Sequence, residues 1–108
     1  MQTTPGSTVE PNGTRDDVLS ALRAVKREWG DALGIVQMGV FGSFARNSAT
    51  AASDLDVYVR TATPNPYLLV HLKEAIEGRV RRKVDLVRMR ERMNPMLKAR
   101  IEREGVDV

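Results

Sequence analysis

The stretch Ile35-Val36-Gln37-Met38-Gly39-Val40-Phe41-Gly42-Ser43 decides the fold, because an apolar run of strand length stops abruptly at a glycine and a serine. Such a run, bounded by turn residues, predicts a buried β-strand over 35–41. A second strand is predicted over 54–59, where apolar and polar residues alternate, and alternate residues face opposite sides of a sheet. The apolar set is Leu55, Val57 and Val59, and the polar set is Asp54, Asp56 and Tyr58.

Helices are predicted before and after these strands along the sequence. The first begins at Thr14, which together with Asp17 is similar to a capping box, and it ends near Gly30 and Gly34. A short helical turn is expected over 44–47. A second long helix opens at 63–66 and ends at Gly78. A third strand covers 84–89, and a last helix runs from Asn94-Pro95, an N-cap with proline at the first helical position, to Gly105.

This order of elements predicts an α/β or α+β fold, with a small three-stranded sheet flanked by helices. Residues 1–14 are rich in Thr, Gly and Pro and are expected to form a disordered tail, so the folded domain covers 15–108. A sheet this small leaves edges that a partner could cover.

Composition excludes several classes of protein. The chain has 108 residues, enough for the hydrophobic core of one small domain. It has no cysteine, which excludes a disulfide framework and a thiolate metal site. A net charge of +3 is too small an excess to indicate a nucleic-acid binder. No apolar run approaches the roughly 20 residues of a membrane helix, and the polar N-terminus is unlike a secretory signal, so the expected setting is the cytoplasm.

Three aspartates and one turn are the candidates for chemistry. Asp54 and Asp56 are about 7 Å apart on one side of a strand, and their mutual repulsion is relieved by a hard cation such as Mg²⁺. Asp85 lies in the third strand and joins them if that strand neighbours the second, and three carboxylates suit a two-metal phosphoryl-transfer centre. Gly42-Ser43 ends a strand with exposed N–H groups that can cradle phosphate.

Each of these features also has an ordinary structural interpretation. Asp54 and Asp56 can belong to a solvated sheet face, and Asp85 can be an edge-strand residue paired with Arg81, Arg82 or Arg88. Gly42-Ser43 can be a plain turn, for which both residues are common. The features taken singly therefore leave the function open.

Their combination is more specific. The chain has Gly42-Ser43, then Asp54-x-Asp56 after ten residues, then Asp85 in a later apolar strand, and it ends with Ile101-x-x-Glu104-Gly105. This pattern resembles the polymerase-β-like nucleotidyltransferase superfamily, and more closely its minimal nucleotidyltransferase (MNT) family, over roughly residues 15 to 105. Asn47 stands where many members have glycine, and asparagine also tolerates a left-handed backbone.

The resemblance implies a role for each matching residue. Asp54 and Asp56 would bind two Mg²⁺ ions, and Asp85 would bind one of them and help to activate the attacking hydroxyl. Gly42 and Ser43 would hold the nucleoside triphosphate. Arg46 and Ser53 occupy positions that reach the phosphates in related transferases, although Arg46 can equally be an ordinary surface cation.

The resemblance also implies a function, namely Mg²⁺-dependent transfer of AMP from ATP to a hydroxyl with release of pyrophosphate. The acceptor would be a tyrosine of a HEPN-type ribonuclease toxin, so that the protein acts as the antitoxin of that pair. A non-catalytic module that neutralises the toxin by covering it is one alternative, and a nucleotidyltransferase of small molecules such as aminoglycosides, acting as a dimer, is another. A homo- or hetero-oligomer is compatible with each, and nucleic acid is not expected as a direct ligand.

Overall fold

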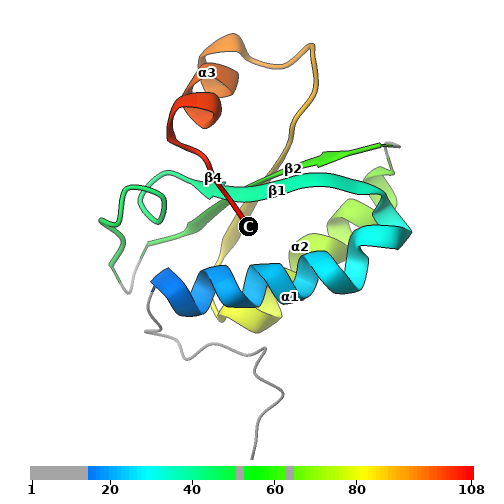
Figure 1. Ribbon diagram of the computed structural model, residues 1–108, viewed down its shortest axis with the longest axis horizontal. Coiled ribbons are helices and arrows are strands. Elements are labelled where there is room, and N and C mark those ends of the chain that lie inside the picture. The colour runs from blue at the N-terminus through cyan, green and yellow to red at the C-terminus, as the bar shows by residue number, and fades with distance from the viewer. Residues whose placement is uncertain (1–14, 51–52, 63–64) are drawn as a thin grey trace, which may run out of the picture.

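A computed structural model gives the fold and describes residues 15–50, 53–62 and 65–108. The predicted tail over 1–14, with Thr14 of the expected capping box, lies outside these residues. The elements are α1 (Arg15–Leu33), β1 (Ile35–Phe41), β2 (Leu55–Thr61), α2 (Pro66–Val80), β3 (Val84–Arg88), α3 (Pro95–Glu104) and β4 (Val106–Asp107) (Figure 1). They confirm the predicted mixture of helices with a small mixed sheet.

The sheet has the strand order β3-β2-β1-β4. β1 pairs antiparallel with both β2 and β4, whereas β2 and β3 are parallel and are connected through α2. α1 and α2 cover one face of the sheet, and α3 lies over the other (Figure 1). The two faces therefore have different surroundings, and only one of them carries the main core.

The main core lies between the sheet and the α1–α2 layer. The alternation in β2 places Leu55, Val57 and Val59 in this core, and all three are fully buried. Tyr58 points the other way and belongs to a smaller cluster under α3, completed by Phe41, Met89 and Ile101. The predicted division of β2 into two faces is confirmed, because burial of alternate side chains fixes the register of the strand.

The predicted count of three strands is wrong by one. β4 consists of two residues, which pair with Gly39 and Val40 of β1. A side chain on Gly39 would collide with the carbonyl of Val106 and the hydroxyl of Tyr58, so the close approach of β4 depends on this glycine. Two residues are too few to show any alternation in sequence, and the strand exists only because α3 returns the chain to the free edge of β1.

One helix boundary and one short segment also differ from expectation. α2 continues through Gly78 and ends at Val80, followed by a left-handed cap at Arg81, whose N–H donates to Glu77 O at 2.9 Å. The segment 42–47 forms consecutive hydrogen-bonded turns and no helix. The predicted cap at Asn94 is confirmed, since its side chain accepts the N–H groups of Met96 and Leu97. Asn65 caps α2 in the same way by accepting the Leu68 N–H, a role that was not predicted. No helix of the described segments combines the length and the apolar character needed to cross a membrane.

Candidate active site

The acidic residues lie on the sheet face opposite the main core. Asp56 in β2 and Asp85 in β3 are register partners in the parallel pair, so they are direct neighbours across the two strands. Asp54 immediately precedes β2 and is exposed, Asp85 is exposed, and Asp56 is half-buried. The condition that the third strand lies beside the second is met, and the parallel pairing places Asp85 beside Asp56 near the start of the two strands, with Asp54 just before β2.

Burial and the neighbouring charges both change the pKa of Asp56. Burial raises the pKa of the Asp56 carboxyl above its ordinary value, and the negative charges of Asp85 and Asp54 raise it further, while Arg100 and Arg46 act in the opposite direction. In the part of the chain that the structure describes, no three acidic or histidine side chains are grouped tightly enough to hold a metal ion together.

Asp85 does not form the structural ion pair that the sequence allowed. Among the described residues, no ion pair includes Asp85. Arg82, one of its possible partners, donates from Nη1 to Ser53 O at 2.8 Å and to Thr50 O at 3.1 Å. Its guanidinium also lies 4.7 Å from the centre of the Phe44 ring. Arg82 therefore holds Thr50 and Ser53, the latter directly before Asp54, against the start of β3.

The turn after β1 lies directly against Asp56. Gly42 has a φ of +73°, and a side chain at this position would collide with the Asp56 carboxylate. The turn is closed by hydrogen bonds from the Arg46 N–H to Gly42 O (3.0 Å) and from the Ser48 N–H to Ser43 O (2.8 Å). Asn47 has a φ of +60°, as expected for an asparagine that replaces glycine. The geometry thus explains why this turn begins with glycine.

The remaining candidates are Ser43, Ser53 and Arg46. Ser43 is half-exposed at the start of the turn, and Ser53 accepts the Thr50 N–H on its hydroxyl at 2.9 Å. Arg46 is not a solitary surface cation, because its Nη1 donates to Glu104 Oε1 at 3.2 Å. The phosphate-binding roles of these residues stay predictions.

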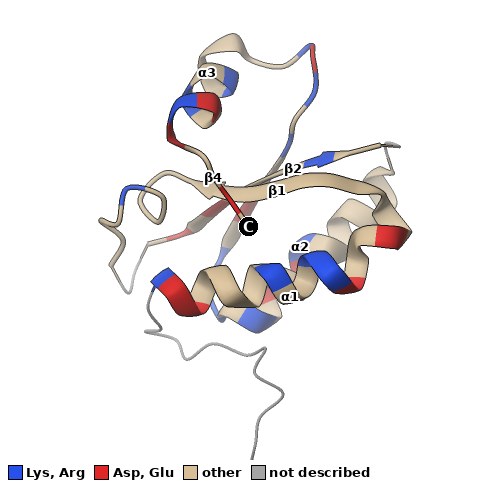
Figure 2. Cartoon of the chain, viewed as in Figure 1, with Lys and Arg blue, Asp and Glu red and all other residues tan. Residues whose placement is uncertain are grey.

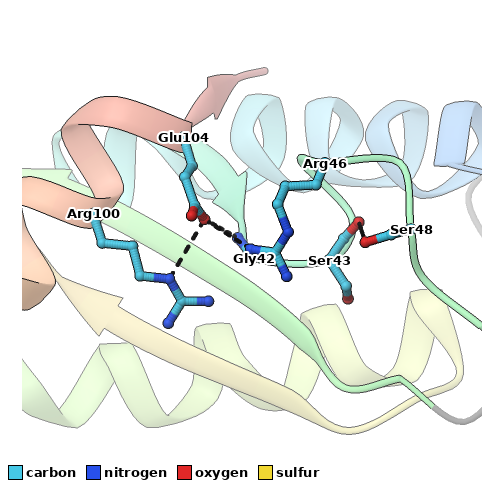
Figure 3. A network of polar contacts seen from close by, with 6 residues as sticks. All are labelled: Gly42, Ser43, Arg46, Ser48, Arg100 and Glu104. Atoms are coloured by element: carbon cyan, nitrogen blue, oxygen red, sulfur yellow. Dashed lines mark hydrogen bonds and ion pairs between the residues drawn. The ribbon is translucent and has the colours of Figure 1, made fainter.

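Two residues of α3 reach this turn: Glu104, which the sequence pattern included without a role, and Arg100, which sequence reasoning missed. Glu104 Oε1 accepts the Gly42 N–H at 3.2 Å and lies 3.4 Å from Arg100 Nε (Figure 3). Although partial burial raises the pKa of the Glu104 carboxyl, the Gly42 hydrogen bond and the charges of Arg46 and Arg100 outweigh it and lower the pKa below its ordinary value. The i, i+4 spacing of Arg100 and Glu104 indicates a shared helix face, but the sequence does not show what that face meets.

A separate cavity lies near β4 on the same side of the sheet. It has a volume of about 360 Å³, and its lining includes Tyr58, Met89, Ile101 and Asp107. The Tyr58 hydroxyl donates to Asp107, and burial followed by this hydrogen bond raises the pKa of Tyr58 well above its ordinary value. None of the predicted site residues lines this cavity, so it is distinct from the aspartates and the turn.

The sequence and the structure were compared with known proteins. The family model described as "Polymerase beta, Nucleotidyltransferase" matches residues 30–108. The chain is 30% identical to "Putative protein adenylyltransferase MJ0126" of Methanocaldococcus jannaschii over 92 residues, which is 84% of this chain and 94% of that protein. It is 35% identical to "Protein adenylyltransferase MntA" of Thermococcus cleftensis over 75 residues, 68% of this chain and 76% of that protein.

Solved structures agree with these matches. A structure described as a "putative minimal nucleotidyltransferase" superposes with a TM-score of 0.75 at 29% identity, covering 88% of this chain and 96% of that chain. A chain of a "toxin-antitoxin with AMP-PNP" superposes with a TM-score of 0.68 at 20% identity, covering 80% of this chain and 68% of that chain. The second likeness is evidence for the fold alone.

Proposed function

The chain belongs to the polymerase β nucleotidyltransferase family, in its minimal nucleotidyltransferase branch, and from this premise we propose that it transfers AMP from ATP to a hydroxyl of a partner protein. The relatives whose printed names are protein adenylyltransferases support this choice of acceptor, because the chain covers most of their length. The acceptor hydroxyl that we propose is a tyrosine of a HEPN-type toxin, and its modification makes this chain the antitoxin.

One structural observation carries the proposal. Asp56 and Asp85 are in register on parallel strands, and the Gly42 turn lies directly against the Asp56 carboxylate. A site for nucleotidyl transfer needs acidic groups near the α-phosphate and hydrogen-bond donors near the phosphates that leave. The starts of β2 and β3 and the turn after β1 supply these two kinds of group side by side.

The acidic residues fit Mg²⁺ by their chemistry. All three offer carboxylate oxygens, the ligands that this ion prefers. Burial raises the Asp56 pKa and the charges of Asp85 and Asp54 raise it further, and a cation relieves this repulsion between the carboxylates. Asp54 and Asp85 are exposed, so their side chains can rotate towards Asp56. In this proposal Asp54 and Asp56 hold two Mg²⁺ ions and Asp85 holds one of them. When bound, the ions would neutralise charge on the α-phosphate and align the reacting groups.

The protein residues orient the substrates for a balanced exchange. The acceptor oxygen forms a bond to the α-phosphorus of ATP, and the bond from that phosphorus to the bridging oxygen of the β-phosphate breaks. Pyrophosphate leaves with the electron pair, and Asp85 helps to take the proton of the acceptor hydroxyl. Gly42 and Ser43, with Arg46 and Ser53, hold the triphosphate in line for this attack.

The test is transfer of label to the partner. The protein, Mg²⁺ and α-labelled ATP are incubated with the toxin encoded beside it, and label on the toxin is measured for wild type, Asp56→Asn and the control Asp16→Asn. Asp16 is an exposed residue in the first turn of α1. We expect labelling by wild type and the control, and a loss of about 100-fold or more in Asp56→Asn, as for removal of a group that acts in the transition state.

Two results would count against the proposal. Equal labelling by Asp56→Asn and wild type would place the chemistry elsewhere. No label with wild type, together with full protection of cells by Asp56→Asn, would favour a protein that neutralises the toxin by binding alone.

A further inference from the structure

An acidic side chain of α3 occupies a cluster of three N–H donors at the turn. Oε1 of Glu104 lies 3.2 Å from the Gly42 nitrogen, 3.2 Å from Arg46 Nη1 and 3.4 Å from Arg100 Nε (Figure 3). We call these three donor groups the anion site. The Glu104 side chain is only 16% exposed, whereas the side chains of Arg46 and Arg100 are 49% and 41% exposed. The carboxylate is therefore on the inside, and the two cations remain accessible from solvent.

One carboxylate satisfies the anion site only in part. Two guanidinium groups carry two positive charges and ten N–H groups, but Glu104 supplies one negative charge and engages one N–H of each arginine through a single oxygen. A phosphate group carries up to two negative charges and three acceptor oxygens, and charge-assisted bonds from arginine to phosphate are often bidentate. The site therefore matches phosphate better than it matches the carboxylate that fills it.

The anion site also lies next to the acidic residues. The position that a side chain of Gly42 would take is within 3.4 Å of Arg100 Nη2 and collides with the Asp56 carboxylate, so Arg100 and Asp56 approach the same side of this glycine. Figure 2 shows acidic and basic residues adjoining in the last turn of α3, above the sheet. A polyphosphate chain can thus extend from the acidic residues to the anion site.

We propose that Arg100 is a further phosphate-binding residue, which together with Arg46 and the Gly42 N–H receives the terminal phosphates of the nucleotide, and that Glu104 is an internal anion that these phosphates displace. This inference rests on the proposed function for the class of its ligand. Glu104 keeps the two arginines oriented towards the turn, and it lowers the apparent affinity for phosphate, because the open form of the site is only a fraction of the population. Binding of nucleotide releases Glu104 and so changes how α3 is held to the turn.

The experiment uses inorganic pyrophosphate without Mg²⁺, measured by titration calorimetry on the full chain. Glu104→Gln keeps the shape of the side chain and removes its charge, and Glu102→Gln makes the same change at an exposed residue of α3. We expect Glu104→Gln to bind pyrophosphate about tenfold more tightly than wild type, as removal of an internal competitor predicts. We expect the affinity of Glu102→Gln to stay within about twofold of wild type, because an exposed charge is screened by solvent.

A second pair of variants tests Arg100 without touching Glu104. Arg100→Gln is expected to weaken pyrophosphate binding by about tenfold, the effect of losing one charge-assisted contact, whereas Arg103→Gln, an exposed arginine of the same helix, changes it little. In the double variant Arg100→Gln/Glu104→Gln the gain from Glu104→Gln should disappear. This pair remains informative if Glu104→Gln does not fold.

Three outcomes would overturn the inference. The first is weaker pyrophosphate binding by Glu104→Gln than by wild type. The second is an equal gain in affinity in Glu102→Gln and Glu104→Gln, and the third is an equal loss of affinity in Arg100→Gln and Arg103→Gln. The first would mean that Glu104 only clamps α3 to the turn, and the second that the effect is one of overall charge. Pyrophosphate binding needs neither an acceptor nor group transfer, so these results are independent of whether the protein adenylylates a toxin.

Discussion

At the scale of single residues, Gly42 links the fold to the site. Its backbone is left-handed, its N–H donates to Glu104, and the Asp56 carboxylate occupies the space where a side chain would be. A residue with a Cβ in the left-handed region costs about 1–2 kcal/mol relative to glycine. The glycine is therefore required by the backbone and by the neighbouring carboxylate at the same time.

We expect Gly42→Ala to lower the free energy of unfolding by about 1–3 kcal/mol, from backbone strain and the collision with Asp56. Transfer activity should fall at temperatures where the variant is still folded, because Asp56 must move. The matched control is Gly30→Ala, which lies within α1 with open space around its Cβ and should gain about 0.5–1 kcal/mol. Urea denaturation measures both, and equal stabilities for the two variants would refute the argument.

At the scale of elements, the parallel pairing of β2 with β3 aligns Asp56 with Asp85. Arg82, which precedes β3, also holds the residues before β2, because its side chain donates to the carbonyls of Thr50 and Ser53. The same guanidinium packs on Phe44 of the turn. One arginine thus connects the turn, the approach to Asp54 and the start of β3.

We expect Arg82→Lys to reduce transfer about tenfold, although Arg82 contacts no substrate, because lysine lacks the planar group that bonds the loop and stacks on a ring. The free energy of unfolding should fall by only about 1 kcal/mol, the scale of one or two lost hydrogen bonds. Arg81→Lys, the same change at the exposed neighbour, is the control. Unchanged transfer by Arg82→Lys would show that the arginine does not position the site.

At the scale of the whole molecule, the two faces of the sheet have separate tasks. One face packs on α1 and α2 and supplies the main core, while the other carries the aspartates and meets α3 through the smaller cluster. The acidic residues do not contribute to either core, and their mutual repulsion works against folding. If cations bind between the aspartates as we propose, the stability of the protein depends on their concentration.

Magnesium should therefore stabilise the folded protein. We expect 10 mM MgCl₂ to add about 1.4 kcal/mol if the ion binds with a Kd near 1 mM, which raises Tm by about 4–8 °C for a domain of this size. Calorimetric scans at constant ionic strength measure the shift, and Asp56→Asn should lose most of it. A shift of the same size in Asp56→Asn would show that Mg²⁺ acts elsewhere.

Much of the fold was predictable because its signals are local. The continuous apolar run of β1, the alternation in β2, the cap at Asn94 and the glycine after α3 depend on neighbours in the chain, and all four are confirmed. The end of α2 was mispredicted at Gly78 because a helix passes an exposed glycine at a cost of only about 1 kcal/mol. Burial of Ile76 and Val80 on either side of it outweighs that cost.

The sequence by itself determined the chemistry available to this protein: the aspartates, the turn that begins at Gly42, and a strand whose two faces differ. Only the tertiary structure decided the distances between them. The pairing of Asp56 with Asp85 depends on a crossover through α2, and the contact of Glu104 with Gly42 joins residues separated by 62 positions. Such contacts are set by how whole elements pack, and no pattern of neighbouring residues records that packing.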